Sequence, residues 1–226
     1  MNKYIIILII AIAIVSLAIT VVLVNPKKYT LSPQEGCQVI IGNEGNKKID
    51  IVFLTDKVEE NLINNSIDFF LGSATFSNHK NKFNFFYAGE INCKIVNDFV
   101  FCYSKEAIKQ SAVCPNDYVI VLTNQSSEIR SSAYINFISL NANTPNNLIL
   151  HEFGHVFANL ADEYVPSVIP FGSKNCEKKC SNFNNIEGCF EGCSETDYFR
   201  SSEDSIMRSA ITSDYRKLNT LLIENN

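Results

Sequence analysis

An uncharged apolar run, Ile5–Val24, stands near the start of this chain and separates it into two parts of different character. A helix needs about 20 consecutive apolar residues to cross the hydrocarbon core of a bilayer. A cleavable signal peptide usually has a shorter apolar region of about 7–15 residues, followed by small residues at the cleavage position. We therefore expect a transmembrane anchor over residues 4–24, with a cleaved signal peptide as the alternative.

All eight cysteines follow the apolar run. An even number of cysteines in an exported domain is typical of disulfide bonds, because oxidising compartments favour them. The lysines flanking the run are too balanced to set its orientation by the positive-inside rule. The cysteines therefore decide the topology, and we expect a single-pass protein of the cell membrane whose domain lies outside the cytoplasm.

Four of the cysteines lie close together, in the pattern C-x3-C…C-x3-C. They are Cys176, Cys180, Cys189 and Cys193. We expect two disulfides within this cluster, because free thiolates are less stable outside the cell. A structural zinc site is the alternative, since the spacing is close to that of known zinc sites.

The order of apolar segments predicts an α/β domain with a mixed, mostly parallel sheet. Strands are expected at 49–54, 82–88, 98–103, 118–123 and 133–140, and helices at 57–71, 146–160 and 211–223. We expect the folded domain over 48–226, a polar stalk over 25–47, and a long irregular Cys-rich loop over 165–204. Thr144 and Pro145 suggest the N-cap and the first position of the middle helix. The net charge of -5 gives no basic surface, so no nucleic-acid partner is expected.

Two of the three histidines, His151 and His155, lie four residues apart in the helix expected over 146–160. Residues four apart lie on the same side of a helix, so both imidazoles can bind one zinc ion. Glu152 lies on the adjoining face, where its carboxylate can take a proton from a water on the metal. This pattern predicts a zinc site with Glu152 as general base. The third histidine, His79, lies in a polar stretch and is expected at the surface.

A catalytic zinc ion usually has three protein ligands and one open position. Asp162 is the first candidate for the third ligand, and Glu163 is the alternative. In a continuous helix, Asp162 would lie about 10 Å beyond His155 along the axis, too far to share one ion. The helix must therefore end and the chain turn back, and Ala158-Asn159 is the expected place because asparagine tolerates left-handed backbone.

Residues 151–164, His-Glu-Phe-Gly-His-Val-Phe-Ala-Asn-Leu-Ala-Asp-Glu-Tyr, resemble the signature of the bacterial IgA peptidase family of zinc metallopeptidases. Residues 81–87 and 117–122 are similar to strands of that family. Ser205-Ile206-Met207-Arg208 resembles the methionine turn that lies beneath the zinc ion in metzincin-type folds. The resemblance implies a metzincin-like catalytic domain, one catalytic zinc ion, and a protein or peptide substrate.

Immune inhibitor A-type peptidases also resemble this site, and the aspartate of their Asp-Glu-Tyr binds the metal. That aspartate corresponds to Asp162 here. This chain has one more residue between His155 and Asp162, and it lacks the glycine that usually makes the turn. Tyr164, Tyr198 and Arg208 are candidates for stabilising an oxyanion.

Together these patterns predict a membrane-anchored, extracytoplasmic zinc endopeptidase. One alternative is a non-catalytic cell-surface binding module that keeps a metal for stability. The presence of Glu152 argues against that alternative, because a structural zinc site needs no general base. The other alternative is a zinc hydrolase that acts on a non-peptide amide.

Overall fold

The computed structural model describes residues 35–226 of the chain. The transmembrane helix expected over 4–24 lies outside the described residues. No helix within residues 35–226 is both long enough and apolar enough to cross a membrane.

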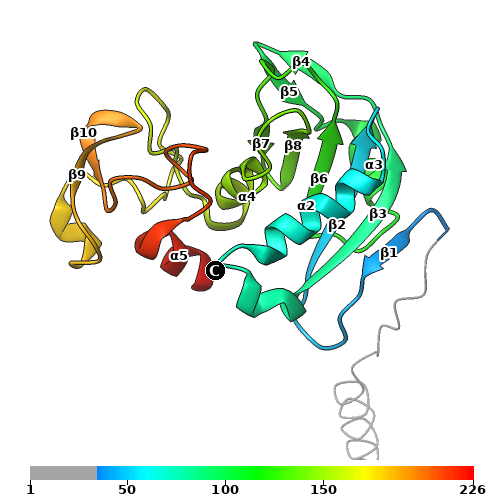
Figure 1. The fold of residues 1–226 in the computed structure, drawn as a ribbon, viewed down its shortest axis with the longest axis horizontal. Coiled ribbons are helices and arrows are strands. Elements are labelled where there is room, and N and C mark those ends of the chain that lie inside the picture. Colours follow the sequence, from blue (N-terminus) through cyan, green and yellow to red (C-terminus); the bar gives the residue numbers. More distant parts are fainter. Residues whose placement is uncertain (1–34) are drawn as a thin grey trace, which may run out of the picture. The chain divides into compact units, whose positions relative to one another are not determined.

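A six-stranded mixed sheet forms the centre of the described domain, with strand order β1-β3-β2-β6-β8-β7 (Figure 1). The strands are β1 (Gln38–Ile41), β2 (Ile49–Asp56), β3 (Phe83–Glu90), β6 (Tyr118–Thr123), β7 (Ser132–Tyr134) and β8 (Phe137–Asn141). The four inner strands run parallel, whereas β1 and β7 pair antiparallel with their neighbours. The α/β class and the mixed, mostly parallel sheet are thus confirmed.

Helices cover both faces of the sheet, which explains why its inner strands are apolar on both sides. Ile51 and Phe53 of β2 pack toward α2 (Asn61–Gly72), α4 (Leu148–Ala158) and α5 (Arg216–Glu224). Val52 and Leu54 pack on the other face, toward α3 (Lys105–Ser111) and the hairpin of β4 (Lys94–Val96) and β5 (Phe99–Phe101). A short 3-10 helix, η1 (Ser77–Lys82), precedes β3.

Several boundaries differ from those expected. The segment 133–140 contains two strands, β7 and β8, because Ile135 has a positive φ of 58° and the chain turns there. Asn147, not Thr144, occupies the N-cap position of α4, while the Thr144 hydroxyl donates to the carbonyl of Asn141. The expected stalk, 25–47, includes β1, which pairs with β3 at the edge of the sheet.

The Cys-rich segment is more regular than expected. It contains a short 3-10 helix, η2 (Cys180–Phe183), and a hairpin of β9 (Phe190–Cys193) and β10 (Glu195–Arg200). Disulfides join Cys176 to Cys193 and Cys180 to Cys189, as predicted for this cluster. Two further disulfides join Cys37 to Cys114 and Cys93 to Cys102, so no cysteine is left as a thiolate for zinc.

The two bridges of the Cys-rich segment differ in burial, and we expect them to differ in their contribution to stability. Cys176 and Cys193 are 3% and 0% exposed and pack against Ala161, whereas Cys180 and Cys189 are exposed. Replacing Cys176 and Cys193 together by serine should lower the free energy of unfolding by about 2–4 kcal/mol. The same change at Cys180 and Cys189 should lower the free energy of unfolding by less, because no buried contacts are lost. Urea denaturation of the two double variants would measure this, and a larger loss for the exposed bridge would contradict it.

Candidate metal centre

Helix α4 carries the site because one of its sides is buried against the sheet. Leu150 and Phe153 are fully buried, and the Phe153 ring packs edge-on against Phe70 at 4.9 Å between ring centroids. His151 and His155 lie on the side that faces a cavity, and their side chains are 12% and 21% exposed. The apolar side of the helix therefore sets the direction in which both imidazoles point.

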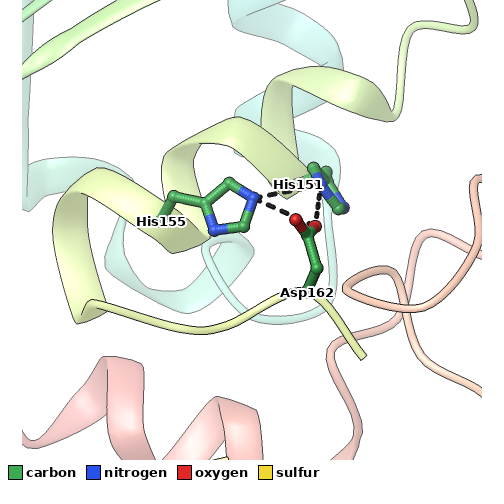
Figure 2. A group of neighbouring side chains, drawn as sticks. All are labelled: His151, His155 and Asp162. Atoms are coloured by element: carbon green, nitrogen blue, oxygen red, sulfur yellow. Dashed lines mark hydrogen bonds and ion pairs between the residues drawn. The ribbon is translucent and has the colours of Figure 1, made fainter. Parts of the chain in front are cut away.

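Helix α4 ends where the sequence predicted a turn. Asn159 adopts the left-handed conformation, with φ 52° and ψ 36°. The N–H of Leu160 then donates to the carbonyl of Gly154 at 3.2 Å. This reversal brings the chain back along the helix, so that Asp162 lies beside the two histidines (Figure 2).

The side chains of His151, His155 and Asp162 converge on one point. Asp162 Oδ1 lies 3.0 Å from His151 Nε2 and 3.3 Å from His155 Nε2. The two Nε2 atoms lie 3.1 Å apart. One ligand atom from each residue therefore falls within 4.8 Å of the other two, so the group could hold a metal ion.

The tautomers of the histidines favour a cation at this point. His151 Nδ1 lies 2.8 Å from the carbonyl of Ile206, and His155 Nδ1 lies 2.7 Å from the carbonyl of Leu160. A carbonyl only accepts, so each Nδ1 donates, and in the neutral imidazole each Nε2 keeps a free lone pair. Two facing lone pairs and a carboxylate oxygen repel one another unless a proton or a metal cation lies between them. The donor set, two imidazole nitrogens and one carboxylate oxygen, fits zinc.

The charges around the two histidines affect the protonation of the cluster. Burial disfavours the charged form of His151, but its hydrogen bond with Asp162 and the charges of Glu152 and Asp162 outweigh burial and raise the pKa of His151 to about 9. Burial also opposes ionisation of Asp162, yet its bonds with both histidines hold the pKa of Asp162 well below the usual range. Without a metal ion, a protonated His151 beside the Asp162 carboxylate is therefore the favoured state, and a metal ion bound there would displace that proton.

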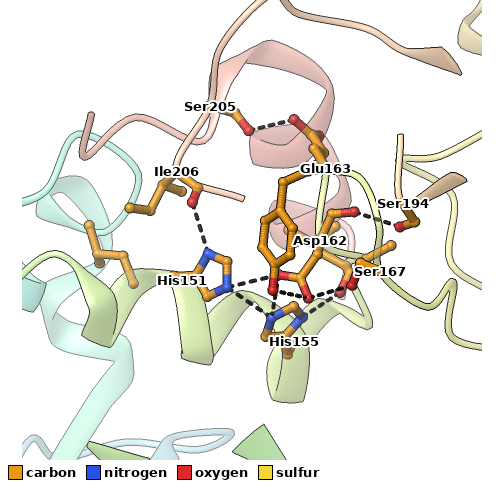
Figure 3. Close-up of polar contacts among 12 residues, drawn as sticks. His151, His155, Asp162, Glu163, Ser167, Ser194, Ser205 and Ile206 are labelled. Carbon is orange, nitrogen blue, oxygen red and sulfur yellow. Dashed lines mark hydrogen bonds and ion pairs between the residues drawn. The ribbon is translucent and has the colours of Figure 1, made fainter. Parts of the chain in front are cut away.

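The second oxygen of Asp162 is held by two hydroxyl groups. Ser167 Oγ donates to Asp162 Oδ2 at 3.0 Å (Figure 3). Tyr164 Oη donates to the same oxygen, also at 3.0 Å. Ser194 Oγ donates to the backbone carbonyl of Asp162 at 2.5 Å. These bonds turn Oδ1 toward the histidines. Groups that hydrogen-bond to a metal ligand typically affect the affinity for the metal, in addition to the ligands themselves.

Glu163, the alternative third ligand, points away from the cluster. Its carboxylate is fully buried and accepts hydrogen bonds from Ser205 Oγ at 2.5 Å, Asn219 Nδ2 at 2.9 Å and Asn175 Nδ2 at 3.2 Å. Its N–H donates to the carbonyl of Met207 at 2.8 Å. Glu163 thus connects the irregular segment after α4 to the turn at 205–208 and to α5.

The turn at 205–208 packs directly beneath α4. Met207 is fully buried, and its Sδ would lie 2.8 Å from a Cβ placed on Gly154. The ring of Tyr215 would lie 3.0 Å from the same position, and its hydroxyl donates to the carbonyl of Leu150. The same turn supplies the Ile206 carbonyl that orients His151. Gly154 is therefore needed for the close approach of helix and turn.

A cavity of about 660 Å³ opens over the cluster. Besides His151, His155 and Asp162, its walls include Glu152, whose pKa is raised above its ordinary value by burial. Of the candidates for stabilising an oxyanion, Tyr164 and Arg208 line the cavity. Tyr198 is not among the lining residues; it packs near the Cys176–Cys193 bridge, with Lys178 Nζ 5.0 Å from its ring centroid.

The residues at the rim of this site include several that the sequence did not indicate. Arg130, Ser167 and Ser194 belong to segments that approach Asp162 or the cavity only through the fold. His79 lies on η1, and it is not part of the cavity lining.

Comparison of the sequence with models of known protein families and with curated proteins gives no match. The class of protein must therefore be argued from the site. Three of its residues could hold a metal ion, with the buried carboxylate of Glu152 beside them and an open cavity above them.

Gly154→Ala tests the packing of α4 on the turn. Alanine is favoured over glycine in a helix by about 1 kcal/mol, but here the new Cβ would overlap Met207 and Tyr215. We expect the variant to be destabilised by about 1–3 kcal/mol. Gly72→Ala is the matched control, because Gly72 also lies in a helix and a Cβ there meets nothing within 4 Å. Thermal unfolding of both variants would show the difference; equal or higher stability for Gly154→Ala would contradict the packing argument.

The variants Asp162→Asn and Glu163→Gln distinguish the roles of the two adjacent carboxylates. Loss of a metal ligand should weaken zinc binding by more than about 100-fold, since loss of an outer partner alone typically costs about 10–100-fold. Glu163→Gln should instead lower the stability of the fold, because its amide N–H₂ replaces an oxygen that accepts either from Ser205 or from Asn175 and Asn219. Zinc titration with a competing chelator, together with unfolding curves, measures both quantities. The ligand assignment fails if Glu163→Gln strips the metal and Asp162→Asn retains it.

Proposed function

We propose that this protein is a zinc-dependent hydrolase, and more specifically an endopeptidase similar to the bacterial IgA peptidase family. The observation that carries the proposal is the position of Glu152. It is a buried carboxylate that directly follows one ligand of the cluster and lines the cavity above it. A purely structural metal site has no use for such a group.

Zinc held by His151, His155 and Asp162 would lower the pKa of a bound water to near neutrality and polarise a substrate carbonyl. Glu152 would accept a proton from the attacking water and deliver it to the leaving amine. Burial raises the pKa of Glu152, which makes its carboxylate a stronger base toward that water. Tyr164 and Arg208 line the same cavity and could donate to the carbonyl oxygen as it becomes negative.

The shape of the cavity supports a peptide as substrate. Ser132 and Ala133 of β7 line it, and β7 is the last strand of the six-stranded sheet. An extended peptide can pair through its own backbone with the part of an edge strand that no other strand covers. This arrangement favours a polypeptide over a small non-peptide amide, which would not need a strand beside the site.

The surroundings of the site support the remaining parts of the proposal. The turn at 205–208 lies beneath α4, as the methionine turn does in metzincin-type domains, and Met207 is fully buried there. Four disulfides suit an oxidising compartment outside the cytoplasm. A membrane anchor at 4–24 would hold the enzyme at the cell membrane.

Glu152→Gln tests the proposed role of the general base. The variant should keep its zinc, since Glu152 is not among the three ligands, and should lose peptide cleavage by about 10²–10⁴-fold. His155→Ala is the comparison, because it should lose metal and activity together. Zinc content by elemental analysis and cleavage of a peptide library by mass spectrometry measure the two effects. Cleavage by Glu152→Gln at the rate of the parent would rule out the peptidase mechanism.

A further inference from the structure

The charges that line the cavity are unevenly distributed. Among the described residues that line the cavity, only Glu152 and Asp162 are acidic. Both belong to the proposed metal centre. The remaining charged residues of the lining are two arginines, Arg130 and Arg208. The cavity therefore offers positive charge to a substrate, although the chain as a whole has a net charge of -5.

Arg130 is held in a defined position at the cavity wall. Its Cζ lies 3.9 Å from the centroid of the Phe99 ring, and both residues line the cavity. Its backbone is fixed as well, because Arg130 N–H donates to the carbonyl of Asp98 and its carbonyl accepts from Val100 N–H, each at 2.9 Å. Phe99 of β5 thus serves as a platform for the guanidinium group.

This stacking leaves the donors of Arg130 available. A guanidinium group that stacks through its face keeps its N–H groups in the plane, directed away from the ring. None of the ion pairs within residues 35–226 joins Arg130 to a carboxylate, because all of them are formed by other basic residues. Arg130 is therefore an oriented guanidinium group that has no carboxylate partner within residues 35–226 and can form two hydrogen bonds with one.

Arg208 differs from Arg130 in its role. One of its terminal nitrogens donates to the carbonyl of Glu163 at 3.2 Å, so Arg208 belongs to the turn that supports the metal centre. It adds positive charge to the cavity but is tied to the backbone beside the ligands. Arg130 is the residue that is free to recognise a substrate group.

We propose that the cleft selects peptides with a carboxylate near the cleaved bond, and that Arg130, supported by Phe99, binds that carboxylate. Arginine forms two parallel hydrogen bonds with a carboxylate, which gives geometric selectivity that a single point charge does not. The carboxylate can belong to an aspartate or glutamate side chain or to a peptide C-terminus. The inference rests on the proposed function for the presence of a peptide in the cleft.

Binding to the zinc-loaded, full-length Glu152→Gln protein tests the inference without cleavage. The probes are peptides of one length with an uncharged fluorophore, blocked at both ends, that carry a single glutamate, glutamine or lysine. A fourth peptide has no acidic side chain but a free C-terminal carboxylate. Fluorescence anisotropy should give a Kd at least about 10-fold lower for the glutamate peptide than for the glutamine peptide. Tighter binding of the fourth peptide instead would identify the C-terminal carboxylate as the group recognised.

Substitution of Arg130 should change this preference in a specific way. Arg130→Glu should reverse it, so that the lysine peptide binds most tightly, and Phe99→Leu should reduce it without reversal. Lys105→Glu is the matched control, because it makes the same change of charge at an exposed position on α3 that does not line the cavity. It should leave the order of the peptides unchanged.

The outcomes separate this inference from the proposed function. Equal binding of the three blocked peptides, with no preference for a free C-terminus, would overturn the role of Arg130. So would an Arg130→Glu variant with the preference of the parent. If the parent protein cleaves no peptide but its carboxylate preference depends on Arg130, the peptidase proposal fails and the binding site stands.

Discussion

The hydrogen bonds from Nδ1 of His151 and His155 to backbone carbonyls are the interactions on which the rest of the site depends. One carbonyl belongs to Leu160, just after the left-handed turn at Asn159, and the other to Ile206, far along the chain. Each bond sets the tautomer of its imidazole and directs Nε2 toward Asp162. The two imidazoles therefore take this orientation only when α4, the returning segment and the turn at 205–208 are all in place.

The segments that supply these carbonyls have little regular structure of their own, so other interactions must hold them. Glu163 connects the returning segment to Ser205 and Asn219 through a fully buried carboxylate. The Cys176–Cys193 bridge packs beneath Ala161, and Ser194 beside it binds the carbonyl of Asp162. Buried hydrogen bonds and a cross-link thus hold these segments, whereas α4 is held by packing of its apolar side against the sheet.

The parts of the fold that could be predicted from the sequence are those set by local patterns. β6 has the expected bounds, since a continuous apolar run is typical of a strand buried on both faces. The break at Asn159 follows from the distance between His155 and Asp162, if both bind one ion, and from the tolerance of asparagine for left-handed backbone. The β9–β10 hairpin was missed because disulfides, not apolar periodicity, stabilise it. The contacts of Ser167 and Ser194 with Asp162 depend on tertiary packing, and no local signal marks those serines.

Zinc K-edge X-ray absorption spectroscopy of the purified full-length protein tests the central claim most directly, because it reports the atoms around the metal. The account predicts one zinc ion per chain with only nitrogen and oxygen neighbours at about 2.0–2.2 Å. Two of them should show the outer-shell scattering of imidazole, from His151 and His155, and one should be a carboxylate oxygen from Asp162. Sulfur neighbours at about 2.3 Å, or fewer than two imidazoles, would contradict the account.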